Sequence, residues 1–408
     1  MRKLVICWFV LCTVVIEVYS QGCSLTVDMF DDQHKPVLVD NSTSKYRLVF
    51  PQNGNIDLKT GGRINFLCPN PRNTLTITHT NLTQATCLYG TTVRIIQNTE
   101  DVGSITCKNG VRGEAISTSI RCGGGQGYII RLGFTVSSSD FLTLIEVCYN
   151  GRRGTALYSN HQLIGKEIAY SSKSSYRPSF STAQLAPGVA ANLAFKQVYE
   201  KSNFNRLLGS AKLAEKYINS KSFLARGHLS PDADFLFASW QIATFFYVNV
   251  APQWQAINNG NWKRLESLSR NTAKSYNDTL EVYTGIHEVL QLMNAEDIET
   301  DMYMTSDGKL PIPKFIWKIL YLQTSKKAIS FISLNNPFAS SLDNSDMLCK
   351  NVCNRYGWDN PAWTNGSKGF VYCCDARDLL KVVPTGPKIT IRGILEAPER
   401  VMKFADYE

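Results

Sequence analysis

The sequence predicts an α+β fold in two domains, in which a disulfide-rich all-β N-terminal domain precedes a domain of mixed helices and strands. The chain has 408 residues, whereas a single hydrophobic core rarely grows beyond about 250–300 residues. Short β-branched runs separated by turn residues fill its first part, which is typical of an all-β domain. Helical and strand-like patterns are mixed in the remainder, which favours an α+β domain.

The first twenty residues predict export. Two basic residues precede an apolar run from Leu4 to Val15, and a small residue, Ser20, ends the segment. This order is typical of a cleaved secretory signal. A retained membrane anchor is the alternative, but the apolar run is short and Glu17 interrupts its end. We therefore expect residues 1–20 to be a signal peptide and the protein to be secreted, extracellular and free of membrane spans.

Cysteines and glycosylation sequons agree with export. Ten cysteines remain after the signal peptide, and an even number in an oxidising compartment indicates up to five disulfides. Six lie between Cys23 and Cys148, enough for three bridges within that segment, although the pairing cannot be deduced from sequence. Among the C-terminal four, Cys349 and Cys353 have a spacing that zinc could use, but disulfides are favoured, with the adjacent Cys373 and Cys374 bonded to different partners. Four sequons predict a glycoprotein: Asn41, Asn81, Asn277 and Asn365.

The charge narrows the kind of partner. The formal net charge is +9 and the pI is about 8.9, which favours a polyanion such as nucleic acid, an anionic glycan or a membrane surface. Charge alone does not choose among them.

The predicted N-terminal domain covers residues 21–150. Its strand-like runs are "TLTITHT" from Thr74, "TTVRIIQ" from Thr91, "YIIRLGFTV" from Tyr128 and "FLTLIEVCY" from Phe141. The glycine cluster at 123–127 is followed by a strand-like run, so a turn is favoured over a phosphate-binding loop, which would need a helix there. The Ser-, Gly-, Arg- and Lys-rich stretch 151–181 is expected to lead the chain into the second domain.

The predicted second domain covers residues 151–408. Helical spacing occurs in 190–213 and 261–277, a strongly apolar run covers 237–252, and strand-like runs are found at 280–285, 315–322 and 328–334. This mixture predicts an α+β domain.

One group of polar residues forms a candidate catalytic site. His228 lies in "FLARGHLSPDADF", and Asn258, Glu266 and Arg270 follow at separations of eight and four residues. On a helix, Glu266 and Arg270 would lie one turn apart on the same face. Taken singly, each has a plain structural reading: a hydrogen-bonded histidine, a helix cap and a solvated ion pair. Their joint occurrence within about fifty residues favours a site.

Phosphodiester hydrolysis needs this set of groups. A water must lose a proton at neutral pH, negative charge at phosphorus must be neutralised, and the leaving alkoxide needs an electrophile. A histidine, arginines and a hard divalent cation supply these functions. Magnesium keeps most of its waters and prefers oxygen ligands, so an asparagine carbonyl and a carboxylate suit it.

At this point the chain resembles a known family. The motifs "RGH" at 226–228, "NVAPQ" at 249–253 and "INNGNWKRLE" at 257–266, followed by Arg270, resemble the DNA/RNA non-specific endonucleases of the ββα-metal type. The core of the resemblance spans about 223–270 and a looser one reaches from about 166 to 397. The resemblance implies a ββα-metal nuclease domain with a mixed sheet. The signal peptide, the cysteine-rich first half and the length resemble secreted crustacean nucleases such as the duplex-specific nuclease.

The resemblance also implies roles for individual residues. His228 resembles the general base, Asn258 the single protein ligand of hydrated Mg²⁺ (with Mn²⁺ as an alternative), and Glu266 the carboxylate that holds the waters of the metal. The further catalytic positions are Arg226, Arg270, Asn249 and Arg177, of which the arginines resemble phosphate or transition-state contacts and Asn249 a supporting or substrate-contacting position. The expected substrate contacts are Arg226, Lys263, Arg264, Arg270 and Gln253, with Lys274 adding to the basic cluster.

At one position the chain departs from the family pattern, and two tryptophans lie among the basic residues of the motifs. The family often has aspartate before the Arg-Gly-His motif, where this chain has Ala225; Asp232 and Asp234 are the nearby residues that could take over the task of that aspartate. Trp254 and Trp262 lie among the basic residues, and for at least one of them a core position is favoured over base stacking.

The leading hypothesis is therefore a secreted, Mg²⁺-dependent endonuclease that cuts DNA without sequence preference, duplex before single strand and RNA as a further substrate, and leaves 5′-phosphates. The alternative is a catalytically weak basic protein that binds extracellular nucleic acid or anionic glycans. A carbohydrate- or sulfate-directed hydrolase lacks a recognisable pair of carboxylates or nucleophile, and a mitochondrial location lacks an arginine-rich transit sequence. No protein partner is predicted, and the oligomeric state stays open.

Overall fold

The computed structural model describes residues 22–70 and 72–399. The predicted signal peptide lies outside these residues. Within them, no helix has the length and apolar character needed to cross a bilayer.

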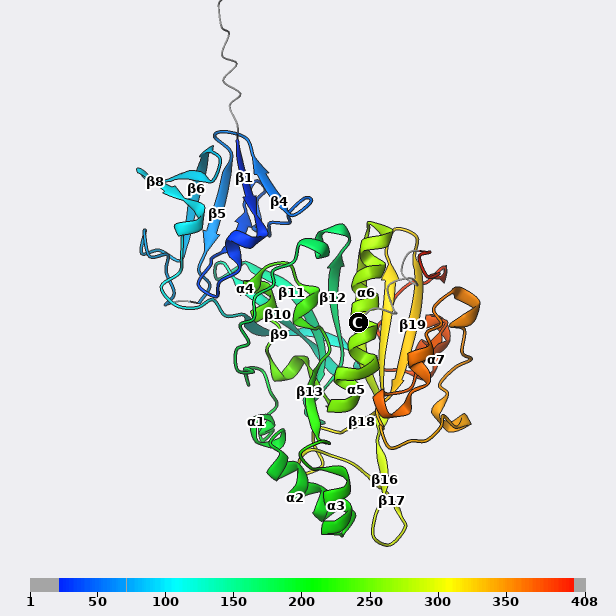
Figure 1. Cartoon of the computed structure of the whole chain (residues 1–408). Coiled ribbons are helices and arrows are strands. Elements are labelled where there is room, and N and C mark those ends of the chain that lie inside the picture. Colours follow the sequence, from blue (N-terminus) through cyan, green and yellow to red (C-terminus); the bar gives the residue numbers. More distant parts are fainter. Residues whose placement is uncertain (1–21, 71, 400–408) are drawn as a thin grey trace, which may run out of the picture.

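A nine-stranded sheet forms the centre of the molecule (Figure 1). Its order is β20-β19-β18-β15-β12-β11-β10-β9, with β21 pairing parallel to β19 and every other pair antiparallel. The strands are β9 (Glu114–Cys122), β10 (Gly127–Thr135), β11 (Phe141–Asn150), β12 (Thr155–Ile164), β15 (Thr279–Val289), β18 (Pro313–Leu322), β19 (Lys327–Leu334), β20 (Val371–Cys374) and β21 (Gly393–Ile394).

A smaller β module precedes this sheet and stands apart from it in Figure 1. Its six-stranded sheet has the order β3-β2-β5-β6-β7-β8, and β1 pairs with β4 beside it. These strands are β1 (Cys23–Thr26), β2 (Val37–Asp40), β3 (Arg47–Leu48), β4 (Asn55–Leu58), β5 (Arg63–Leu67), β6 (Leu82–Tyr89), β7 (Thr92–Ile95) and β8 (Asn98–Asp101). The module contacts the large sheet's domain where the Glu167 carboxylate accepts the backbone N–H groups of Asn53 and Gly54 at 2.9 and 3.0 Å.

The change of sheet does not coincide with the predicted domain boundary near residue 150. Strands β9, β10 and β11 lie within 114–150, yet they belong to the nine-stranded sheet, so the change from one sheet to the other falls between Asp101 and Glu114. The stretch 151–181 is not a simple linker either, because it contains β12, an inner strand of the large sheet. The run 74–80 is also no strand: it forms turns, with one isolated bridge from Leu75 to Cys107.

Other expectations are confirmed. The fold is mixed α+β with an all-β N-terminal region, and the glycine cluster turns the chain from β9 into β10 with φ near +58° to +87° at Gly123–Gly125. All ten cysteines outside the signal peptide pair, as Cys23–Cys87, Cys68–Cys107, Cys122–Cys148, Cys349–Cys374 and Cys353–Cys373. The adjacent Cys373 and Cys374 therefore have different partners, which leaves no free thiolate for zinc among them.

The helices are short except for two. They are α1 (Ala191–Ala194), α2 (Gln197–Leu208), α3 (Ala211–Tyr217), α4 (Ala238–Ile242), α5 (Gln255–Ile257), α6 (Lys263–Tyr276) and α7 (Ala376–Val382). Helix α6 lies against the large sheet (Figure 1) and buries Leu265, Ser269 and Ala273. It ends at Asn277, whose left-handed conformation (φ 52°) is a common helix stop.

Candidate active site

A β hairpin and helix α6 carry most of the predicted site residues. Strand β13 (Leu224–His228) pairs antiparallel with β14 (Val250–Trp254), and His228 lies opposite Val250 at the end of the hairpin. The chain then passes through α5 and an irregular turn at Asn258–Trp262 into α6. Strand, strand and helix therefore form one unit, in the order that the resemblance implied.

The hairpin contains the motifs "RGH" at 226–228 and "NVAPQ" at 249–253 and explains how they fit together. A Cβ atom on Gly227 would lie 2.5 Å from Oε1 and 2.9 Å from Cβ of Gln253, its diagonal neighbour on β14, so only glycine fits beside this glutamine. Gln253 itself is 1% exposed. It therefore packs inside the hairpin, and its predicted contact with substrate does not fit this structure.

His228 is held between aromatic rings. Its ring centroid lies 5.0 Å from those of Phe180 and Phe245. Burial lowers the pKa of His228, against the opposing charge of Asp232, while Arg177 lowers the pKa further. The imidazole is therefore neutral at pH 7, and its buried Nε2 has no partner among the described residues. A neutral imidazole with a free nitrogen can accept a proton.

Arg226 lies in a cage of three aromatic rings. Its guanidinium carbon is 5.3 to 5.9 Å from the ring centroids of Phe180, Phe195 and Tyr247. Nε donates a hydrogen bond to the Tyr247 hydroxyl at 3.1 Å. The rings orient the cation without neutralising it, since aromatic faces attract a guanidinium but carry no net charge.

Asp232 links the two halves of the site. Its carboxylate forms an ion pair with Arg177 (Nε to Oδ2, 3.1 Å), and its charge acts on both His228 and Glu266. Arg177, predicted from a short motif, therefore lies in the same site. Neither Asp232 nor Asp234 makes a hydrogen bond to His228, so no described carboxylate orients this imidazole directly.

Glu266 and Asn258 have the properties of ligands for a hydrated metal ion. Burial, aided by Asp234 and Asp232 and opposed by Lys318, raises the pKa of Glu266 to about 7. Glu266 and Asn258 are half-buried, and neither side chain forms a hydrogen bond or ion pair with a described residue. No cluster of three or more His, Cys, Asp or Glu that could hold a metal occurs in the described ranges. The free amide and carboxylate oxygens thus fit a hard ion that keeps most of its waters.

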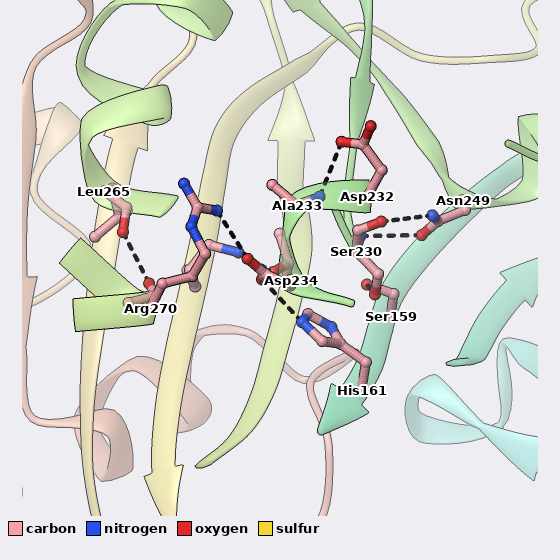
Figure 2. A network of polar contacts seen from close by, with 12 residues as sticks. Ser159, His161, Ser230, Asp232, Ala233, Asp234, Asn249, Leu265 and Arg270 are labelled. Carbon is pink, nitrogen blue, oxygen red and sulfur yellow. Dashed lines mark hydrogen bonds and ion pairs between the residues drawn. The ribbon is translucent and has the colours of Figure 1, made fainter. Parts of the chain in front are cut away.

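A buried ion pair fixes Arg270 (Figure 2). Oδ1 of Asp234 accepts from Nη1 of Arg270 at 2.9 Å, and Oδ2 accepts from Nε2 of His161 at 3.0 Å. Burial alone would raise the pKa of Asp234, but the His161 hydrogen bond and the Arg270 charge hold the pKa below its usual value. Burial lowers the pKa of His161. Asp234 is therefore an anion between a cation and a neutral imidazole.

A buried lysine lies close to the start of α6. Lys318, on β18, is 0% exposed; its Nζ donates to the Thr284 hydroxyl at 2.6 Å and lies 5.2 Å from the Trp262 ring centroid. Burial lowers the pKa of Lys318, and the charges of Glu266 and Asp234 oppose this. Trp262 and Trp254 are each 1% exposed, so both tryptophans are core residues and neither is placed to stack on a base.

Two asparagines position the site through the backbone. Asn249 is fully buried, accepts from the Ser230 N–H at 3.0 Å and donates to the Ser230 carbonyl at 2.9 Å (Figure 2). It also donates to the Thr244 carbonyl at 3.1 Å. These bonds occupy both the oxygen and the nitrogen of its amide group, which suits a supporting position and not a substrate contact. Asn261 donates to the carbonyls of Ala362 and Gly369, both at 2.7 Å, and so fixes the turn that presents Asn258.

The basic residues at the start of α6 face outward. Lys263 is exposed and Arg264 half-buried, and no ion pair with a described residue neutralises either one. Both remain available to a polyanion. His161 and Lys318, by contrast, were missed by sequence reasoning, because a single histidine or lysine in a strand carries no signal of its partner.

The β13–β14 hairpin, the turn that carries Asn258 and helix α6 with Glu266 and Arg270 have the arrangement of a ββα-metal nuclease fold. The chain matches the DNA/RNA non-specific endonuclease family over residues 125–379, more than half of its length, and it belongs to that family. It is thus related to nucleases, and the match begins at the turn between β9 and β10.

The chain is also similar to individual salivary proteins of insects. A salivary endonuclease of Lutzomyia longipalpis is 34% identical over 284 residues, which cover 69% of this chain and 67% of that protein. A salivary endonuclease of Culex quinquefasciatus is 24% identical over 380 residues (91% of this chain and 92% of that protein). The salivary protein Tsal2A of Glossina morsitans morsitans is 24% identical over 379 residues (92% and 94%). The likeness to crustacean nucleases stays a resemblance.

Proposed function

We propose that this protein is a secreted, Mg²⁺-dependent endonuclease that hydrolyses phosphodiester bonds of DNA, duplex DNA first and RNA as well, without sequence preference and with 5′-phosphate products. The observation that carries the proposal is His228, a neutral imidazole with an unpartnered Nε2 in the same site as Arg177 and Glu266. Such a nitrogen can take the proton of an attacking water.

The other residues divide the remaining tasks. Arg226, whose charge the aromatic cage leaves free, would contact a non-bridging phosphate oxygen, and Arg270 would stabilise negative charge that grows in the transition state. Asn258 and Glu266 would hold the hydrated divalent ion, Mg²⁺ with Mn²⁺ as an alternative. When bound, this ion supplies charge neutralisation at the phosphate and at the leaving oxygen.

Sequence-independent cutting follows from the types of side chain available. Lys263, Arg264 and Arg270 can bind phosphate oxygens, which carry no sequence information. Both tryptophans near the site are buried, so they offer no platform for reading bases.

Secretion and glycosylation belong to the same proposal. The relatives named above are salivary proteins by name, and the chain begins with the pattern of a signal peptide. Four exposed asparagines carry the predicted sequons: Asn41, Asn81, Asn277 and Asn365. We further propose that the catalytic unit begins near Glu114, with the six-stranded module as a separate accessory unit.

The proposal is tested with a supercoiled plasmid. The secreted protein should degrade it with Mg²⁺ and fail with EDTA, and His228→Ala should lower turnover by about two to four orders of magnitude while DNA affinity stays nearly intact, since a general base and not a binding contact is removed. Asn258→Ala should raise the Mg²⁺ concentration needed for half-maximal rate. If the folded wild type shifts DNA in a gel but never cuts it, the alternative of a nucleic-acid-binding protein replaces the enzyme.

A further inference from the structure

A polar cavity of about 330 Å³ adjoins the candidate active site. The serine-rich segment at 171–174 forms one wall, and the C-terminal half of α6 forms another. Arg177, Asp232 and Arg270 line this cavity and also belong to the site described above. The cavity is therefore continuous with the place where the scissile phosphate would bind.

Positive charge dominates the walls. Four cations and one anion line the cavity: Lys173, Arg177, Arg270, Lys274 and Asp232. The two arginines already pair with acids, at 3.1 Å to Asp232 and 2.9 Å to Asp234. Lys173 and Lys274 are exposed, and neither pairs with an acid in the part of the chain that the structure describes. Two lysine charges thus face the cavity without a counter-charge of their own.

The serine-rich wall is held in place. The Ser172 N–H donates to the Leu236 carbonyl at 2.6 Å, and the Ser172 carbonyl accepts from Nε2 of Gln241 at 2.8 Å. The N–H of Ser174 donates to the Ser172 hydroxyl at 3.3 Å. These bonds fix the segment that carries Lys173, so a ligand would meet a preformed wall.

The spacing of side chains along α6 relates the cavity to Arg270. Glu266, Arg270 and Lys274 are spaced four residues apart, so they share one face of the helix and follow one another at about 6 Å along its axis. Lys274 lies one turn beyond Arg270. An anion beside Lys274 would therefore sit next to the phosphate that Arg270 contacts.

The chemistry of the walls selects the ligand. The described residues that line the cavity include no aromatic ring, and serine, amide and cationic groups predominate. A base would find no stacking partner there, whereas phosphate oxygens would find ammonium groups and hydroxyl donors.

We propose that this cavity binds the backbone phosphate adjacent to the scissile one, with Lys173 and Lys274 as its binding residues. The inference rests on the proposed nuclease function and names a second phosphate subsite for the same substrate. Since each phosphate contact releases counterions, the subsite contributes to affinity and to its salt dependence.

The test compares Lys173→Gln/Lys274→Gln with Lys59→Gln, an exposed lysine of the N-terminal module. DNA binding is measured in the His228→Ala background between 50 and 200 mM salt, a range over which phosphate contacts change affinity strongly. The double variant should bind about tenfold more weakly and reduce the slope of log K against log salt by about 0.9. Lys59→Gln should match its parent. An unchanged slope in the double variant would overturn the subsite.

Two further measurements distinguish a binding role of the two lysines from a role in chemistry and from a site for free phosphate. With His228 intact, the double variant should raise KM more than it lowers kcat; a fall in kcat alone would place the lysines in chemistry and overturn a binding role. Inorganic phosphate is tested as the competitor: inhibition that the double variant loses while its DNA slope stays normal would assign the cavity to free phosphate instead. If the wild type never cuts, the proposed function fails, whereas the slope comparison still decides whether the cavity binds phosphate.

Discussion

Arg226 on β13 and Arg270 on α6 are held by different means. Arg226 is surrounded by three aromatic rings and one hydroxyl, whereas Arg270 forms an ion pair with the buried carboxylate of Asp234. A buried carboxyl also acts on Arg226, that of Glu200, but burial raises the pKa of Glu200 to about 7. The raised pKa leaves this carboxyl partly protonated at neutral pH, so it compensates Arg226 incompletely.

The difference separates two tasks of an arginine. A cation among rings keeps its charge for an incoming phosphate, because the rings orient it without cancelling it. A cation paired with a buried anion has a fixed position but gives part of its charge to that anion. We therefore expect the cage to matter most for activity and the ion pair to matter most for stability.

The largest expected effect comes from Asp234→Asn, which breaks the ion pair while keeping the size of the side chain. Removing one partner of a buried pair leaves an uncompensated charge, so the free energy of unfolding should fall by about 3–5 kcal/mol. Denaturant unfolding, followed by tryptophan fluorescence with the disulfides intact, measures it. Asp232→Asn is the control: its pair with Arg177 is largely exposed on the arginine side, so a loss below about 1 kcal/mol is expected. Equal losses in the two variants would contradict the special place of Asp234.

Arg226→Lys tests the cage. Lysine keeps the charge but lacks the planar guanidinium that stacks on rings and binds a phosphate through two parallel hydrogen bonds. The value of kcat/KM should fall by about two orders of magnitude, or about 2.7 kcal/mol, while the unfolding free energy changes little. Arg63→Lys in the N-terminal module is the matched control. Activity close to wild type would show that charge alone suffices at position 226.

The predicted site residues lie close together along the chain, which is why their arrangement could be expected from the sequence. His228 lies in the hairpin, Asn258 in the turn that follows it, and Glu266 and Arg270 in helix α6, so the spacing of these residues reports their arrangement. The contact between Asp234 and His161 is not local in the sequence. His161 precedes Asp234 by 73 residues and reaches it only because β12 is an inner strand of the large sheet. No local pattern contains such a contact.

The point at which the chain passes from one sheet to the other is hidden in the sequence for a related reason. The strand-like runs from Tyr128 and Phe141 indicate β10 and β11, but such runs do not reveal which sheet a strand joins. Strand β12 was hidden further by the Ser- and Gly-rich residues around it. The exposure of a side chain is equally non-local: Gln253 lies in a matched motif, yet the packing of Gly227 against it keeps it from the surface.

The pH dependence of the unfolding free energy tests the other partner of Asp234, His161. Burial lowers its pKa below the ordinary 6.5, so the unfolded chain binds a proton that the folded protein refuses between that lowered pKa and 6.5. This histidine therefore destabilises the fold as pH falls below 6.5, by up to about 1.4 kcal/mol per pH unit. The variant His161→Gln lacks that proton, and its unfolding free energy should fall less than that of wild type between pH 7.5 and 5.5. His79→Gln, in an exposed turn, should follow wild type. Parallel curves for wild type and His161→Gln would contradict a neutral His161.

The smallest effect is expected from Tyr247→Phe, which keeps the ring of the Arg226 cage and removes the hydroxyl that accepts from Nε. Since the ring contacts persist, the change isolates one hydrogen bond to a cation, worth about 1 kcal/mol, and kcat/KM should fall about fivefold. Tyr276→Phe is the control, because it also loses a hydroxyl, one that donates to the Glu396 carbonyl outside the cage. A loss as large as that of Arg226→Lys would mean that the hydroxyl, and not the rings, positions Arg226. The contrast between a cage and an ion pair would then reduce to two kinds of polar partner.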